Sequence, residues 1–214
     1  MKYWNSVSLS SKSYVISFIF VWLILIIFII SVPKFEIHQS LNSYHDNLLD
    51  FVFSTITFLG DGIFAVVLSL LFFFIDKKKG LFLLLTFLFS SLLAQLLKNF
   101  VFDDFMRPYH YIQSGFLHVP IVSGIKMHAS YSFPSGHTTT IFALTSALSL
   151  FYQSKKIGVS LFVIAVFVGY SRIYLSQHFL ADTLAGSILG VTTSIIIYQI
   201  LRKNRPLVKK TIDI

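Results

Sequence analysis

A histidine and an aspartate near the end of the chain have the spacing that nucleophilic or acid–base chemistry requires. His178 precedes Asp182 by four residues, and both follow the pair Ser171-Arg172. Because residues four apart share one face of a helix, the Asp182 carboxylate can accept a hydrogen bond from one ring nitrogen of His178 and leave the other free. This pairing suits a nucleophile or a general base, and it suits equally a structural hydrogen bond that anchors a helix.

A second histidine lies in the tetrapeptide Pro134-Ser135-Gly136-His137, which precedes three threonines and an apolar run. Ser135 is a residue type that caps a helix, and Gly136 lets the backbone approach a ligand closely. The free N–H groups at such a helix start attract an anion. The same tetrapeptide is also compatible with an ordinary capped helix that carries a solvated histidine.

Three cationic residues accompany the histidines, namely Lys98, Arg107 and Arg172. The fixed fork of donors on a guanidinium matches phosphate oxygens better than an ammonium group does, although a single arginine is also compatible with snorkelling at a membrane interface. An anionic phosphate is the simplest ligand that would use three cations, two histidines, one carboxylate and a helix N-terminus together.

The composition indicates what kind of elements must hold these residues. Of the 214 residues, 55% are hydrophobic and only 12% are charged, about half the charged fraction of a soluble globular protein. A soluble enzyme is therefore not expected, and lipid is the expected solvent for much of the chain. The chain has no cysteine, which excludes thiol catalysis, disulfides, iron–sulfur clusters and thiolate zinc sites.

Six apolar segments are long enough to cross a bilayer. They lie at about 14–32, 51–75, 81–102, 134–153, 157–176 and 183–201, and one long connection covers about 103–133. We therefore expect an all-α membrane protein, a six-transmembrane-helix bundle that forms one domain over residues 1–214. The first apolar segment is too long for a signal peptide and is followed by no small-residue cleavage site, so we expect it to be retained.

The basic residues predict the orientation of this bundle, because cytoplasmic loops are enriched in lysine and arginine. With both termini in the cytoplasm, the histidines and their cationic neighbours lie on the extracytoplasmic side. Membrane topology in this way accounts for the excess of basic residues, so we expect no nucleic-acid partner. Twelve of the 17 basic residues are then cytoplasmic: Lys2, Lys12, Lys77, Lys78, Lys79, Lys155, Lys156, Arg202, Lys203, Arg205, Lys209 and Lys210.

Other features have simpler interpretations. The spacing Gly186-x-x-x-Gly190 predicts close helix contact, which we expect inside the bundle rather than in a dimer. Asp61, between Gly60 and Gly62, is compatible with the outer end of the second segment or with a pair inside the bundle. We expect the histidines of the long connection to be surface residues: His110, His118 and His128.

Together, the histidine and cation clusters resemble the signatures of the type 2 phosphatidic acid phosphatase family. The match covers residues 98 to 182, and the six-helix plan extends it over nearly the whole chain. The matching residues are Lys98 with Arg107-Pro108, Pro134-Ser135-Gly136-His137, and Ser171-Arg172-x5-His178-x3-Asp182.

The first of these signatures departs from the family pattern. The family usually places six residues between its lysine and arginine, whereas eight residues separate Lys98 from Arg107. On a continuous helix these two side chains would lie on opposite sides, so a bulge or an unwound segment is needed to bring both to one site. If the two extra residues displace Lys98, its loss should cost less activity than the loss of Arg107.

The resemblance implies hydrolysis of a lipid phosphomonoester or pyrophosphate without a metal or another cofactor. The basic cytoplasmic loops and the compact size suit a bacterial inner membrane. His178 would attack phosphorus to form a phosphohistidine, Asp182 would orient it, and His137 would protonate the leaving oxygen. The family's substrates include undecaprenyl pyrophosphate, phosphatidylglycerol phosphate, phosphatidic acid and lipid A phosphates. The residues that would hold the phosphate oxygens are Lys98, Arg107, Ser135, Gly136 and Arg172.

Two alternatives from other classes remain open on the sequence. One is a metal-dependent membrane hydrolase that uses His137, His178 and Asp182 as ligands, although three nearby cations argue against a metal ion. The other is a binder or transporter of an anionic lipid, which would need the cations but not a His-Asp pair beside a second histidine. The oligomeric state is not predicted.

Overall fold

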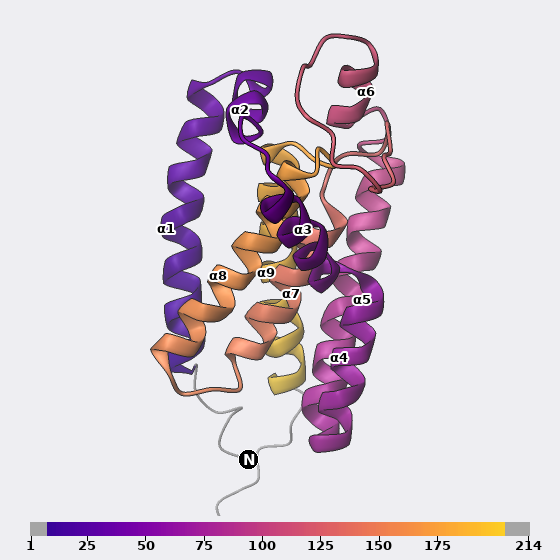
Figure 1. The fold of residues 1–214 in the computed structure, drawn as a ribbon. Helices are drawn as coiled ribbons and strands as arrows, with labels where there is room; N and C mark the ends of the chain where they lie inside the picture. The colour runs from indigo at the N-terminus through magenta and orange to yellow at the C-terminus, as the bar shows by residue number, and fades with distance from the viewer. Residues whose placement is uncertain (1–7, 204–214) are drawn as a thin grey trace, which may run out of the picture.

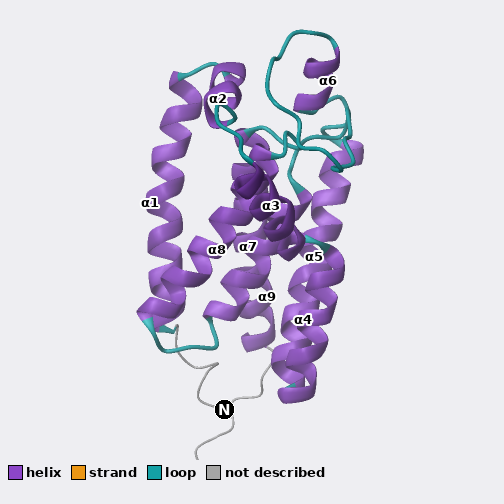
Figure 2. Ribbon diagram, viewed as in Figure 1, coloured by secondary structure: helices purple, strands orange, loops and turns teal. Residues whose placement is uncertain are grey.

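The computed structural model describes residues 8–203, which fold entirely into helices and connections, with no strand in this range (Figures 1 and 2). The elements are α1 (Leu9–Ser31), α2 (Lys34–Leu41), α3 (Asn47–Ile56), the 3-10 helix η2 (Thr57–Gly60), α4 (Gly62–Ile75), α5 (Lys77–Phe100), α6 (Pro108–Gln113), α7 (Gly136–Ser149), α8 (Lys155–Tyr174) and α9 (Leu180–Lys203).

Four of these helices are long and apolar enough to cross a membrane: α1, α5, α8 and α9. A fifth candidate is the pair formed by α3–η2 and α4, which meets the same criterion only as one bent unit. The one expected span still to be placed, at about 134–153, corresponds to α7, a helix of only 14 residues. The prediction of an all-helical protein with several membrane-spanning helices is therefore confirmed, while the number six is not established by helix length.

The second span differs most from the prediction, which was a continuous helix over 51–75. The chain instead bends by 58° between Gly60 and Gly62. Asp61 adopts an extended conformation there, and its Oδ1 accepts a hydrogen bond of 2.7 Å from the N–H of Ile63, capping α4. Aspartate favours such caps over helix interiors because its carboxylate competes for backbone donors.

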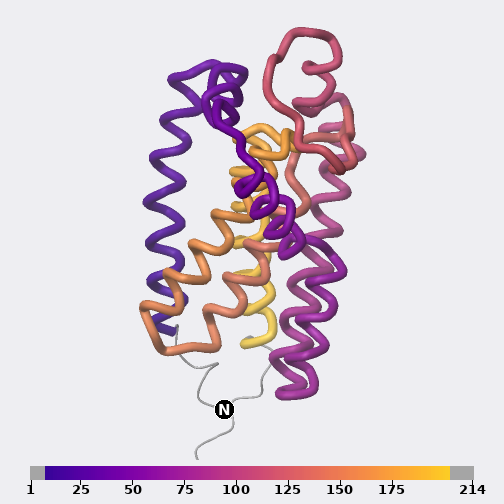
Figure 3. The backbone as a smooth tube through the Cα atoms, viewed as in Figure 1, coloured from indigo at the N-terminus to yellow at the C-terminus, as the bar shows by residue number. Residues whose placement is uncertain are grey.

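Helix α7 forms the centre of the bundle, between α5, α8 and α9 (Figure 3). A Cβ atom added at Gly186 of α9 would lie 2.6 Å from the carbonyl oxygen of Ser135, and one added at Gly190 would clash with the carbonyl oxygen of Thr139. The predicted close contact at this Gly-x-x-x-Gly spacing is thus confirmed, and it lies inside the bundle. It holds the start of α9 against the start of α7.

Helices α2 and α6 lie at one end of the bundle, and the α4–α5 and α7–α8 connections lie at the other (Figure 1). An aromatic cluster packs α6 against α2, because the ring of Phe35 contacts Tyr111 and Phe116 at centroid distances of 4.9 Å. Phe35 also contacts Phe179, in the turn before α9, at 5.8 Å. Neither α2 nor α6 was predicted, because both are too short to show in an apolar pattern.

The two ends of the bundle also differ in charge. Lys77 and Lys155 begin α5 and α8 at the end away from α2 and α6, and Arg202 lies in the last turn of α9. Lys98 and Arg172, in contrast, lie in the last turns of α5 and α8. Four of the twelve predicted cytoplasmic residues, together with both chain ends, fall outside the described residues: Lys2, Arg205, Lys209 and Lys210.

Candidate active site

His178 and Asp182 are brought together where α8 passes into α9. His178 lies in the connecting turn, and Asp182 lies in the first turn of α9. Both are buried, with 2% and 4% of their surface exposed, and His178 Nδ1 is 3.5 Å from Asp182 Oδ2. Nδ1 of His178 has no hydrogen-bond partner within residues 8–203. The predicted proximity of the two side chains is present. The expectation that they share one face of a helix is wrong, because His178 lies in the turn before α9.

The protonation state of His178 follows from its surroundings. Burial, and then the positive charges of Arg107 and Arg172, lower the pKa of His178 well below its usual value. The imidazole is consequently neutral at neutral pH, which is the form that can act as a nucleophile. Since Nδ1 faces the aspartate, Nε2 is the ring nitrogen left for attack.

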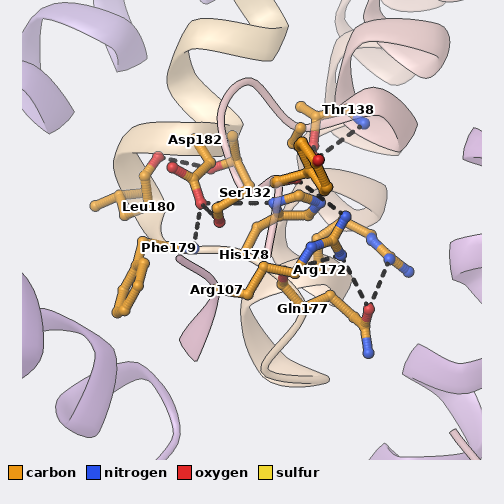
Figure 4. A network of polar contacts seen from close by, with 12 residues as sticks. Arg107, Ser132, Thr138, Arg172, Gln177, His178, Phe179, Leu180 and Asp182 are labelled. Atoms are coloured by element: carbon orange, nitrogen blue, oxygen red, sulfur yellow. Dashed lines mark hydrogen bonds and ion pairs between the residues drawn. The ribbon is translucent and has the colours of Figure 1, made fainter. Parts of the chain in front are cut away.

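The Asp182 carboxylate is held in place by two donors in addition to its contact with His178 (Figure 4). The hydroxyl of Ser132 donates to Oδ2 at 2.5 Å, and the N–H of Phe179 donates to the same oxygen at 2.9 Å. The backbone of the two segments is joined as well, because the N–H of Ser135 donates to the carbonyl oxygen of Asp182 at 3.0 Å. The carboxylate is thus fixed relative to both α7 and α9.

Arg172 is buried in the last turn of α8, with a guanidinium that is only partly hydrogen-bonded. Nη1 donates to Thr57 Oγ1 at 2.7 Å, and Nη2 lies 3.5 Å from Gln177 Oε1. Its Nε has no hydrogen-bond partner within residues 8–203. A buried donor without a partner is costly, and an anion in the site would satisfy it.

Arg107 approaches the same glutamine from the long connection (Figure 4). Its Nη1 donates to both the backbone oxygen and Oε1 of Gln177 at 3.3 Å. Nε donates to the carbonyl oxygen of Ser130 at 2.9 Å, and Nη2 donates to that of Tyr131 at 3.3 Å. The Gln177 side-chain oxygen therefore lies between the two predicted phosphate-binding arginines.

The unusual spacing of Lys98 and Arg107 is accommodated by the end of a helix. Helix α5 stops at Phe100, and the N–H of Arg107 bonds to the carbonyl oxygen of Ala129 rather than to a helical partner. Lys98 is buried and interacts electrostatically with Arg107 and Asp182. The unwinding that would bring both cations to one site is therefore present.

The start of α7 supplies the predicted helix N-terminus. Ser135 caps the helix by accepting from the N–H of Thr138, and a Cβ added at Gly136 would meet nothing within 4 Å. His137 is partly exposed, and its Nε2 lies 3.9 Å from Oδ2 of Asp61. The start of α7 at Gly136 therefore has open space for a ligand, next to the partly exposed His137.

Sequence reasoning missed four residues of this cluster: Thr57, Asp61, Ser132 and Gln177. Of these, Asp61 had been noted without a role. Gln177 directly precedes His178, but a neutral amide before a signature histidine carries no specific pattern. Thr57 and Ser132 are small hydroxyl residues of a kind common throughout this chain. The expectation that His110, His118 and His128 are surface residues is confirmed, because all three are exposed.

The ligand set required by a metal-dependent hydrolase is not assembled. Within residues 8–203, no three histidine, cysteine, aspartate or glutamate side chains converge as a metal site would require. His137 pairs with Asp61, whereas His178 pairs with Asp182. The surrounding cations Lys98, Arg107 and Arg172 make the cluster suited to an anion.

Comparison with known proteins agrees with this geometry. The chain is 30% identical over 155 residues to the lipid A 1-phosphatase of Rhizobium etli, covering 63% of this chain and 64% of the relative. It is 32% identical over 136 residues to the undecaprenyl-diphosphatase of Sulfolobus acidocaldarius, covering 63% and 61%. The match thus spans less than two-thirds of the length of either relative.

A solved structure extends the likeness to the fold. The transmembrane PAP2-type phosphatidylglycerolphosphate phosphatase from Bacillus subtilis superimposes with a TM-score of 0.67 at 27% identity, covering 90% of this chain and 98% of that one. The model of the PAP2 superfamily matches residues 79–206, a range that contains the site residues from Lys98 to Asp182. On this match, the chain belongs to the PAP2 superfamily.

Proposed function

We propose that this protein is a membrane lipid phosphatase that hydrolyses a phosphomonoester or a pyrophosphate of a lipid through a phosphohistidine. The observation that carries the proposal is the buried His178, whose Nδ1 lies 3.5 Å from a carboxylate fixed by two donors. Arg107 and Arg172 lie on the other side of the same turn and meet at Gln177. A nucleophile beside two guanidinium groups suits a phosphoryl group.

The reaction would proceed in two steps. Nε2 of His178 attacks phosphorus as the bond to the leaving oxygen breaks, and His137 gives a proton to that oxygen. Asp182 stabilises the positive charge that develops on the His178 ring. Water then attacks the phosphohistidine and loses its proton to His137, so that the bond between nitrogen and phosphorus breaks and the starting state returns.

Five residues would hold the phosphate oxygens as the charge on them rises. The unpartnered Nε of Arg172 supports this role, because it is a donor that the described residues leave unused. The start of α7 supports it as well, because the first N–H groups of a helix have no intrahelical partner and the space at Gly136 is open. Phosphoryl transfer depends mainly on such positioning and charge stabilisation. The proposed set is Lys98, Arg107, Ser135, Gly136 and Arg172.

A lipid substrate is supported by an apolar cavity next to the site. The cavity has a volume of about 330 Å³ and lies between α1, α7, α8 and α9. It reaches Thr138, the residue after His137, and most of its lining is aromatic or aliphatic. An acyl chain could remain in such an environment, since each buried methylene contributes about 0.8 kcal/mol. The lining includes Trp22, Phe142 and Leu184.

We further propose that the chain forms one integral-membrane unit with six spans, which are α1, the bent α3–η2–α4 segment, α5, α7, α8 and α9. Both termini would be cytoplasmic, and the site would face the extracytoplasmic side of a bacterial inner membrane. The separation of Lys77 and Lys155 from the site end supports this orientation. An impermeant maleimide should label Lys126→Cys in intact cells but not Lys78→Cys, and the reverse labelling would invert the topology.

The substrate is tested by phosphate release from a panel of lipids in detergent micelles. The names of the relatives point to lipid A phosphates, undecaprenyl diphosphate and phosphatidylglycerol phosphate, and phosphatidic acid completes the panel. At least one lipid should exceed glucose 6-phosphate tenfold in kcat/KM, about 1.4 kcal/mol of transition-state preference. Activity should survive EDTA. If the sugar phosphate were hydrolysed best, the assignment of a lipid substrate would be wrong. If EDTA abolished activity and zinc restored it, a metal-dependent enzyme would be favoured.

A further inference from the structure

Asp61 occupies a position that the proposed reaction has not yet used. It lies at the bend of the second span, where its Oδ1 caps α4 and its Oδ2 lies 3.9 Å from Nε2 of His137. The two side chains are 38% and 32% exposed, so they border the open side of the site rather than the packed core. A cap alone would not require the carboxylate to face a histidine on another helix.

The bend is built closely against the site. A Cβ added at Gly60 would lie 2.8 Å from the carbonyl oxygen of His137 and 3.0 Å from its Cβ, so this approach of η2 to α7 requires a glycine. One helical turn before Asp61, Thr57 accepts a hydrogen bond from Arg172. The bent segment α3–η2–α4 therefore contacts two residues of the site, His137 through Gly60 and Arg172 through Thr57. These two contacts hold Asp61 near His137.

The charges around His137 indicate how the Asp61 carboxylate affects the protonation of this histidine. Lys98 of α5, Arg107 of the long connection and Arg172 of α8 are positive, and His178 is the other histidine of the site. Asp182 faces His178, whereas Asp61 faces His137. Cations disfavour a further positive charge, and an opposite charge within about 4–6 Å favours it.

We infer that Asp61 is a positioning residue that favours the protonated state of His137, the state from which a proton reaches the leaving oxygen. The inference rests on the proposed function for the role of His137. The gap of 3.9 Å is longer than a hydrogen bond, so Nε2–H remains able to donate to the leaving oxygen while the carboxylate acts through its charge. When His137 takes a proton from water in the second step, the same charge stabilises the imidazolium that forms.

The test separates the charge of Asp61 from its capping role. Asparagine caps helices about as well as aspartate, so Asp61→Asn should keep the start of α4 and remove only the charge. Asp61→Glu should retain the charge. Asp76→Asn is the matched control, because Asp76 caps α5 at the opposite end of the bundle by accepting from the N–H groups of Lys78 and Lys79.

Two measurements are compared across these variants in micelles. The first follows the imidazole of His137 by NMR in protein labelled with 15N-histidine, with His137→Gln used to assign its signal. Its titration midpoint should fall by about 0.5 to 1 pH unit in Asp61→Asn, a modest shift because the pair is partly solvated. The second is the alkaline limb of kcat/KM, which should move in the same direction. Asp61→Glu should restore most of both values, and Asp76→Asn should leave them unchanged.

An unchanged His137 midpoint in Asp61→Asn would overturn the inference and leave Asp61 as a helix cap. The NMR titration does not depend on turnover, so it decides the inference even if the wild type releases no phosphate from any lipid, a result that would remove the proposed function instead. A shifted midpoint with an unshifted alkaline limb would also overturn it, because the protonated His137 would then have no part in the rate.

Discussion

The hydroxyl of Ser132 donates a 2.5 Å hydrogen bond to Oδ2 of Asp182, the same carboxylate oxygen that faces the His178 ring. Ser132 lies outside the third signature and is fully buried. This bond ties the segment before α7 to the pair that the proposed mechanism uses. The orientation of the nucleophile is thus shared between two segments that are 50 residues apart in the chain.

Ser132→Ala should reduce kcat about tenfold, about 1.4 kcal/mol, with little change in KM. The reason is that Asp182 would keep only the Phe179 N–H as a donor and would orient His178 less well. Single-turnover and steady-state rates measure the effect. Ser114→Ala, at an exposed hydroxyl that bonds only to its own turn, is the control and should keep wild-type rates. A raised KM with unchanged kcat would contradict the assigned role.

Gln177→Ala should raise KM about tenfold and weaken inhibition by vanadate to a similar degree. Its side chain accepts from Arg107 and Arg172, and its Nε2 donates to the carbonyl oxygen of Lys126, so truncation loosens both arginines. Gln177→Glu should be worse than the alanine variant, because a carboxylate there would compete with phosphate for the guanidinium groups. A glutamate variant that binds vanadate as well as the wild type would contradict this role.

Much of this site was predictable because its residues carry specific chemistry at specific intervals. The cap at Ser135 and the contact at Gly186 follow from local rules of helix geometry. The proximity of His178 and Asp182 was predicted, but not its basis, because His178 lies in the turn before α9 and does not share a helix face with Asp182. The contacts of Ser132 and Gln177 do not, because they join segments far apart in sequence and involve residue types that occur throughout the chain. Only the folded arrangement shows which hydroxyl or amide meets a charged group.

The bend at Asp61 shows a different limit of the sequence. Apolar residues continue on both sides of Gly60-Asp61-Gly62, so hydropathy alone predicts one uninterrupted span. The helix ends there because Asp61 caps the next helix and because η2 packs against α7 without a side chain at Gly60. Tertiary packing against α7 thus helps to end the helix at this point, and the hydropathy pattern of a single segment carries no information about such packing.

Lys98→Ala and Arg107→Ala should reduce kcat/KM to a similar degree, at least a hundredfold each. The sequence favoured a smaller loss for Lys98, but the unwinding after Phe100 brings its buried ammonium close enough to interact with Arg107 and Asp182. Steady-state kinetics on the best lipid of the panel compare the two variants, with Lys126→Ala as an exposed control. Near-normal activity of Lys98→Ala would show that the lysine does not reach the phosphate.

The acid limb of kcat/KM should lie below pH 6.5. Burial, and then the charges of Arg107 and Arg172, lower the pKa of His178 from that ordinary value. A histidine with a lowered pKa stays neutral on acidification until the pH falls through the lowered value, so its nucleophilic form persists where a free imidazole would be protonated. In Arg107→Ala the limb should move upward, because one positive charge is removed. A limb at or above pH 6.5 in the wild type would contradict the neutral nucleophile.

The phosphoenzyme is the most direct test of the central claim. Wild-type protein mixed with a 32P-labelled lipid phosphate and quenched within one turnover should carry label that is stable in base and lost in acid, as expected of a phosphohistidine. His178→Ala should carry no label and release no phosphate, whereas His137→Ala should accumulate label if water attack is slowed. Label that persists in His178→Ala, or wild-type turnover by that variant, would contradict the account.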